Sequence, residues 1–174
     1  MRILVRKFDK KNQRVNFNFI LLVAVLLTVT VNGFSQNVPV VTSRMNFETG
    51  MSLNSTVIGR FNSLSTSIKS SIYVENNQVK IAQPNPISLY TDCSSIQTID
   101  NLIVDKSSIE YISIKVKNPS DINSFIRLSR FSNFSNVKYI HVLFEYEISN
   151  SEMESLIKNP SFNCYVVYES RKIM

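Results

Sequence analysis

The stretch from Leu128 to Val142 constrains the fold of this chain more than any other part of it. Its apolar residues recur three apart and end on a step of two, at Leu128, Phe131, Phe134, Val137, Ile140 and Val142. A step of three keeps apolar side chains on one side of a helical or 3₁₀-like path, whereas a step of two is the alternation of a strand. The pattern predicts a helix-like segment that leads directly into a buried strand.

The same layout recurs through the second half of the chain. Strands are expected at 109–116, 137–144 and 164–168, and polar segments at 118–121 and 149–152 can begin the helices between them. The first of these helices would begin near Ile122 and bury Phe125, Ile126 and Leu128, and the second would run through Met153, Leu156 and Ile157. Strand-helix units of this length either stack as a solenoid or cross over within a small parallel α/β sheet.

Two of these segments, 107–118 and 134–142, resemble leucine-rich repeats in which Ile, Val and Phe replace leucine. The L-x-x-L-x-L core of that family matches Ile109, Ile112 and Ile114 in the first segment and Val137, Ile140 and Val142 in the second. Asn118 falls near the asparagine position of the family. The resemblance covers 96–168 and implies a short βα solenoid with a β-rich N-terminal cap. A compact βαβαβ domain with a small parallel sheet is the alternative.

The first half of the chain shows weaker patterns. Val57, Phe61, Leu64 and Ile68 follow helical steps of four, three and four, so a helix is expected there although Gly59 interrupts it. Two short β-runs within 71–82 flank the polar residues 75–78, which predicts a hairpin because Asn tolerates turn conformations. Residues 37–41 contain a proline and are expected to form a linker or an edge strand.

Pro84 and Pro86 make 83–86 the best internal boundary, which divides the chain into a cap or small subdomain at 36–86 and a repeat-like domain at 87–174. Residues 96–104 repeat the apolar rhythm too close to the next strand to be a separate repeat. They are expected to form a hairpin or short capping turn through 105–108.

Residues 1–35 are expected to be a secretory signal peptide. A basic start is followed by an apolar run from Phe19 to Leu27, which is shorter than the roughly 20 residues of a membrane-spanning helix, and by small residues at Gly33 and Ser35. The expected product is exported, with no membrane span, to a periplasmic, cell-surface or extracellular location. The Asn, Ser, Ile and Lys content and the GFSQ ending resemble exported proteins of Bacteroidetes-type bacteria.

The net charge of +6 belongs mostly to this segment, which holds six of the 19 basic residues and one of the 13 acidic residues. The remainder is close to neutral, which argues against nucleic acid as a partner. Cys93 and Cys164 remain, and an oxidising compartment would let them form a disulfide if their Cα atoms come within about 7 Å. Two buried free thiols are the alternative.

Residues for catalysis, metal binding or cofactor binding are sparse, and we expect none of these functions. The chain has one histidine, His141, and no Cys-x-x-Cys pair, and its three glycines, at 33, 50 and 59, are too far apart to form a phosphate loop. Strand alternation places His141 away from the core, on an exposed strand face.

We therefore expect a non-enzymatic, exported interaction module that presents a strand face to a protein or glycan partner. The expected binding residues are Ser113, Lys115, His141 and Leu143, because an apolar group among polar ones is typical of binding surfaces. The alternative is a small exported hydrolase or inhibitor-like domain whose site lies within residues 44–82.

Overall fold

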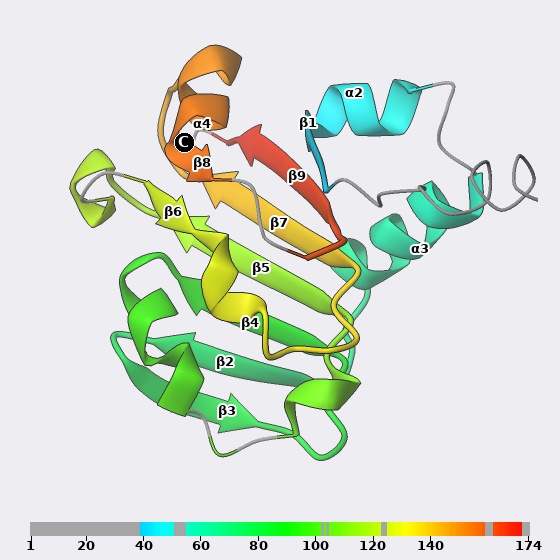
Figure 1. Cartoon of the computed structure of the whole chain (residues 1–174), viewed down its shortest axis with the longest axis vertical. Coiled ribbons are helices and arrows are strands. Elements are labelled where there is room, and N and C mark those ends of the chain that lie inside the picture. Colours follow the sequence, from blue (N-terminus) through cyan, green and yellow to red (C-terminus); the bar gives the residue numbers. More distant parts are fainter. Residues whose placement is uncertain are drawn as a thin grey trace, which may run out of the picture. The chain divides into compact units, whose positions relative to one another are not determined.

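Figure 1 shows the computed structural model of the chain, which describes residues 39–50, 55–101, 103, 105–122, 125–158 and 162–171. Val38–Met174 form one structural unit. The expected signal peptide, residues 1–35, lies outside the described residues.

A seven-stranded, mostly parallel sheet forms the centre of this unit (Figure 1). Its order is β1-β9-β7-β5-β4-β2-β3, and every neighbouring pair is parallel except β2 and β3. The strands are β1 (Val40–Ser43), β2 (Ser71–Glu75), β3 (Gln78–Ala82), β4 (Ser88–Asp92), β5 (Tyr111–Val116), β7 (Tyr139–Phe144) and β9 (Tyr165–Ser170). The chain is therefore of the mixed α/β class, as the strand-helix alternation predicts.

The segments that connect consecutive parallel strands pack on one face of the sheet. They are η1 (Ser94–Asn101), η2 (Lys106–Ser108), η3 (Pro119–Asp121), β6 (Ile126–Arg127), η4 (Leu128–Phe131), α4 (Asn150–Leu156) and β8 (Ile157–Lys158), and β6 pairs with β8. The larger apolar core lies between them and the sheet, and it buries Ile99, Ile112, Phe131, Ile140 and Met153. The stretch 128–142 follows its prediction, since a 3₁₀ turn precedes a strand and all six of its spaced apolar residues are buried.

Two helices, α2 (Arg44–Thr49) and α3 (Ser55–Thr66), pack on the opposite face. Phe47, Phe61 and Leu64 are fully buried there in a second apolar cluster with Tyr111 and Tyr139. The helix expected from the spacing of Val57, Phe61 and Leu64 is confirmed as α3, which ends at Thr66. Gly59 is exposed within it, because it lies on the helix side away from the sheet.

Two further local predictions are confirmed. The hairpin forms between β2 and β3, and its turn residues Asn76 and Asn77 adopt positive φ angles of 52° and 61°, a conformation that Asn adopts more readily than most residues. Helix α4 begins with a capping box, in which the Ser149 hydroxyl accepts from the Glu152 amide and the Glu152 carboxylate accepts from the Ser149 amide at 3.0 Å.

Two local predictions are wrong. For residues 96–104 the hairpin alternative is wrong, because 94–101 form the 3₁₀ helix η1, whose period matches their apolar spacing of three; the other alternative, a short turn through 105–108, agrees with η2. The helix expected to begin near Ile122 is replaced by η3, the two-residue strand β6 and the turn η4. Strand β4 was not predicted at all, and the boundary expected at 83–86 falls between β3 and β4 of one sheet.

Cys93 and Cys164 are both free thiols. Cys93 directly follows the C-terminal end of β4, and Cys164 directly precedes the N-terminal end of β9, with β5 and β7 between these two strands. The two cysteines therefore lie at opposite ends of parallel strands. A six-residue strand, at about 3.3 Å per residue, separates those ends by far more than a disulfide allows. Burial raises the pKa of Cys93 to about 11 and that of Cys164 to about 12, so both thiols are protonated at neutral pH.

Candidate binding groove

Side chains on the α3 side of the sheet form rows that cross the parallel strands. Tyr73 is in register with Tyr90, and Tyr90 with Ser113, so these three form one row over β2, β4 and β5. Two residues further along each strand, a second row begins in which Asp92 is in register with Lys115. Alternation directs both rows to the same face, because the intervening residues point into the larger core.

A groove with a volume of about 320 Å³ lies between these two rows. Val74 and Thr91 contribute to its floor although both are nearly fully buried, because each lies between a residue of the first row and a residue of the second. The groove therefore runs across the strands, with an aromatic wall on one side and a charged wall on the other. Its size is within the usual range for ligand pockets.

The aromatic wall is a stacked pair of tyrosines. The ring centroids of Tyr73 and Tyr90 are 4.8 Å apart with an interplanar angle of 11°, a separation that matches the distance between neighbouring strands. Tyr90 also contacts Tyr111 edge to face, at 6.1 Å and 63°. Tyr73 is 40% exposed, so the pair presents apolar ring surface to solvent beside the groove.

A β-bulge brings a lysine to the end of this wall. Tyr73 is opposite Ile81 and Val74 is opposite Val79, so Lys80 is an extra residue on β3. A bulge of this kind changes the direction of a side chain, and both Lys80 and Ile81 line the groove. Ile81 is half exposed and extends the apolar surface of Tyr73.

The carboxylates of the charged wall already accept hydrogen bonds or form ion pairs within the protein. Asp92 accepts from the Ser95 amide at 2.7 Å, the Asn76 amide at 2.9 Å and the Ser94 hydroxyl at 2.9 Å. Burial opposes ionisation of Asp92, but these hydrogen bonds outweigh it and lower its pKa. Glu75 forms an ion pair with Lys117, and this contact lowers the pKa of Glu75.

The ammonium groups of the groove keep unused donors. Each ammonium has three N–H donors, and the Lys115 ammonium lies 3.0 Å from a carboxylate oxygen of Glu145 while that of Lys80 donates to the Gln78 side chain at 2.9 Å. The groove therefore offers ammonium donors, whereas its carboxylates Asp92 and Glu75 already accept from protein donors.

The four predicted binding residues lie together as a block on neighbouring strands. Ser113 is in register with His141, and Lys115 with Leu143. Ser113 and Lys115 line the groove. Leu143 is half-buried on the same face, between Lys115 and Glu169.

The prediction that His141 is exposed is wrong. The residue is only 4% exposed, because the Phe61 ring of α3 packs against its imidazole edge to face, with the ring centroids 5.4 Å apart. Its Nδ1 is 2.8 Å from the Tyr111 hydroxyl oxygen, and its Nε2 is 2.9 Å from Oε1 of Glu169 without the alignment of a hydrogen bond. Strand alternation predicts the correct side of the sheet, but a helix from the first half of the chain covers that position.

Glu169 is the centre of a partly buried charge cluster next to His141. Its Oε1 also lies 3.1 Å from Arg44 Nη1 and 2.8 Å from Arg171 Nη2. Burial opposes its ionisation, but the contacts with His141, Arg44 and Arg171 outweigh burial and lower the pKa of Glu169 to about 2. Burial raises the pKa of Tyr111 well above its usual value. This cluster links α2 to the sheet through Arg44, and none of its residues is among those that line the groove.

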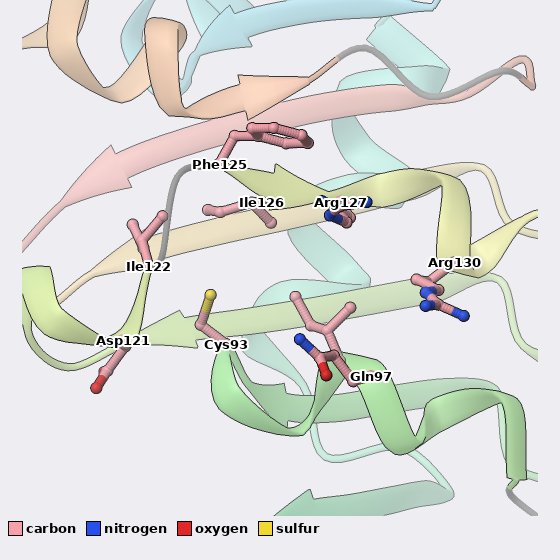
Figure 2. A pocket seen from close by; sticks show the side chains of 9 residues that line it. Cys93, Gln97, Asp121, Ile122, Phe125, Ile126, Arg127 and Arg130 are labelled. Carbon is pink, nitrogen blue, oxygen red and sulfur yellow. The ribbon is translucent and has the colours of Figure 1, made fainter.

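A second, smaller pocket lies on the opposite side of the sheet and has a volume of about 190 Å³. Figure 2 shows Asp121 at one end of it, Arg130 at the other and the Cys93 sulfur between them. Arg130 is paired with Asp100 at 2.7 Å, and Arg127 lies 4.9 Å from the centre of the Phe125 ring. The pocket adjoins a polar hollow of about 520 Å³ beside Cys93. The groove is the better candidate, because it is larger than this pocket and combines the exposed Tyr73 ring with three lysines.

Most residues of the groove were not predicted from the sequence. Tyr73 lies between Ile72 and Val74 in the predicted hairpin, so its outward direction could have been read from alternation. Tyr90 was missed because β4 was not predicted. No sequence pattern reveals the bulge that brings Lys80 into the groove, since it depends on pairing with β2.

Among the described residues, no group of three or more His, Cys, Asp or Glu side chains could hold a metal ion. Over the same residues, no helix has the length and apolar character needed to cross a membrane. Comparisons with known protein families, curated proteins and solved structures find no match to this chain.

Proposed function

We propose that this chain is an exported, non-enzymatic binding module that holds its partner in the groove between the tyrosine and lysine rows. The observation that carries this proposal is the groove itself, where exposed aromatic surface adjoins ammonium groups with unused donors. Binding sites typically combine apolar anchors with a few polar groups that fix orientation. The expected signal peptide supports export.

The chemistry of the described residues supports binding rather than catalysis. The only histidine of the chain is covered by Phe61, and both thiols are protonated at neutral pH, so neither type of group is available as a general base or nucleophile at the surface. Residues 44–82, where a hydrolase site was the alternative, contribute Tyr73, Lys80 and Ile81 to the groove instead.

The strand order supports a repeat-like architecture as part of this proposal. Strands β2, β4, β5, β7 and β9 are neighbours in chain order and parallel, and the segments that connect β4 through β9 pack on one face. Such stacking of successive units is what a solenoid requires. Strand β1 and helices α2 and α3 are additions to it, because they close the far edge and cover part of the other face.

Nuclear magnetic resonance can test the proposed function with a panel of soluble ligands. The panel contains an acidic oligosaccharide, a neutral oligosaccharide, an acidic peptide and a neutral peptide. We expect at least one of them to shift signals from β2, β4 and β5, and Tyr73→Ala to remove that shift. Ile68→Ala is the matched control, because Ile68 is exposed on the chain after α3. Binding only outside the groove, or no binding by any member, would reject the proposal.

A further inference from the structure

We infer that the ligand of the groove is a saccharide that carries a carboxylate, such as a chain of uronic acid units. This inference rests on the proposed function, because it assigns the chemical class of the partner held by the same groove. Three features support it: the direction of the groove, the balance of its donors and acceptors, and the position of the aromatic wall beside the lysines.

The direction of the groove argues against an added β-strand as the ligand. A peptide that extends the sheet would lie along β3, whereas the groove crosses β2, β4 and β5. Strand β3 is also protected against such pairing, because it carries Lys80 at a bulge and is followed by Pro84. Lysine, proline and bulges are features by which edge strands avoid pairing.

The balance of polar groups favours an anion. Lys80, Lys115 and Lys117 line the groove, while the Asp92 carboxylate accepts three hydrogen bonds from its own turn. Among the described lining residues, Lys117 pairs with the exposed Glu75 and Lys115 pairs with the largely buried Glu145. An exposed pair such as Lys117–Glu75 is worth little, so a ligand carboxylate can replace it at small cost, and it can accept from a remaining donor of Lys115 while Glu145 keeps its contact.

The aromatic wall favours a ring next to that anion. Tyr73 and Tyr90 present flat apolar surface with hydroxyl groups at its edge, and Lys115 lies one row away on the neighbouring strand. A uronic acid unit has an apolar C–H face, hydroxyl groups at its rim and a carboxylate fixed on the same ring. An acidic peptide side chain lacks the flat face, and a neutral sugar lacks the charge. The uronate alone satisfies both walls with one unit.

The test compares oligogalacturonate with its methyl ester of equal length, which keeps the ring but loses the charge. Binding is followed in the purified chain by fluorescence, which reports tyrosine because the chain has seven tyrosines and no tryptophan. We expect oligogalacturonate to bind at least tenfold more tightly than the ester, and added salt to reduce this difference.

Two variants separate the contributions of the walls. Lys115→Gln should weaken the binding of oligogalacturonate at least tenfold and leave the affinity for the ester unchanged. Tyr73→Ala should weaken the binding of both ligands. Lys138→Gln is the matched control, because Lys138 is exposed at the opposite end of the strands. Thermal unfolding of each variant checks that the fold is intact.

Three results would overturn the inference: no binding of oligogalacturonate, equal affinity for the ester, or no effect of either variant. A hexaglutamate peptide distinguishes failure of the saccharide assignment from failure of the proposed function. If the peptide binds in the groove with dependence on Tyr73 and Lys115 and the uronate does not, the saccharide is wrong and the proposed function stands. If no ligand in either panel depends on Tyr73, both proposals fail.

Discussion

At the scale of single residues, Phe61 determines how α3 packs on the sheet. Its ring is fully buried and contacts Phe47 at 5.0 Å, Tyr139 at 5.9 Å and His141 at 5.4 Å. Replacing it with alanine removes these contacts and leaves a cavity, so we expect Phe61→Ala to lower the free energy of unfolding by about 3–5 kcal/mol. Urea unfolding followed by circular dichroism measures the change.

The control for this prediction is Ile68→Ala. Ile68 is 99% exposed, so its replacement should change the free energy of unfolding by less than about 0.5 kcal/mol. Similar losses in both variants would show that Phe61 is not an anchor of α3.

His141 shows what can be predicted about a residue from its neighbours in sequence. Ile140 and Val142 are buried in the larger core, so alternation correctly places His141 on the opposite face. Its burial depends on Phe61, which lies 80 positions earlier in the chain. No local pattern contains that information, because it arises from the return of the chain across the sheet.

At the scale of elements, β3 is a protected edge strand. Its five residues are all exposed, and the exposed apolar residues Val79 and Ile81 flank Lys80. Lys80→Val would create a run of four apolar residues, at 79–82, on an unpaired edge, which favours pairing with a second copy. We expect the variant to associate at concentrations where the parent chain does not, as measured by size-exclusion chromatography with light scattering.

Lys138→Val removes the same charge outside the edge strands and is the control. Lys138 lies just before β7, in the middle of the sheet. If both variants associate equally, net charge rather than the edge would be responsible. If neither associates more than the parent chain, Lys80 has no protective role.

The accuracy of the predicted elements follows their periodicity. Strands β5 and β7 have buried residues at alternate positions, β9 is a short apolar run, and α4 has a polar cap before its apolar side, so all four were predictable. A spacing of three was ambiguous, because it fits the turns η1 and η4 and also short strand or helix segments. Tertiary contacts with the sheet decide between these outcomes.

At the scale of the whole molecule, the groove was largely unpredictable because it is assembled from four strands. Ser113 and Lys115 were predicted from one strand, whereas Tyr73, Tyr90 and Lys80 enter through the pairing of β2 with β4 and β3. The pairing of β1 with β9 was also not predicted, and it places Arg44 next to Glu169. Segments far apart in sequence therefore determine both the ligand surface and the buried charges.

The partly buried carboxylate of Glu169 predicts how the stability of the molecule depends on pH. The pKa of Glu169 is about 2 in the folded chain and 4.5 for the unperturbed group, and a lowered folded pKa stabilises the protein above the unfolded value. This contribution is complete above about pH 5 and is lost as the pH falls toward 2. It amounts to about 3 kcal/mol at most. Glu110 acts in the same direction, because its contacts with Arg60, at 2.5–3.2 Å, outweigh burial and lower its pKa.

Glu169→Gln tests this assignment, since it resembles the protonated state of that carboxyl at every pH. We expect the variant to be less stable than the parent chain by up to about 3 kcal/mol at pH 7, and the difference to shrink toward zero near pH 2. Urea unfolding at a series of pH values measures both curves. Glu154→Gln, on the exposed side of α4, should follow the parent curve throughout. A difference that stays constant from pH 7 to pH 2 would mean that Glu169 contributes through packing, and its ion pairs with Arg44 and Arg171 would then carry no net stability.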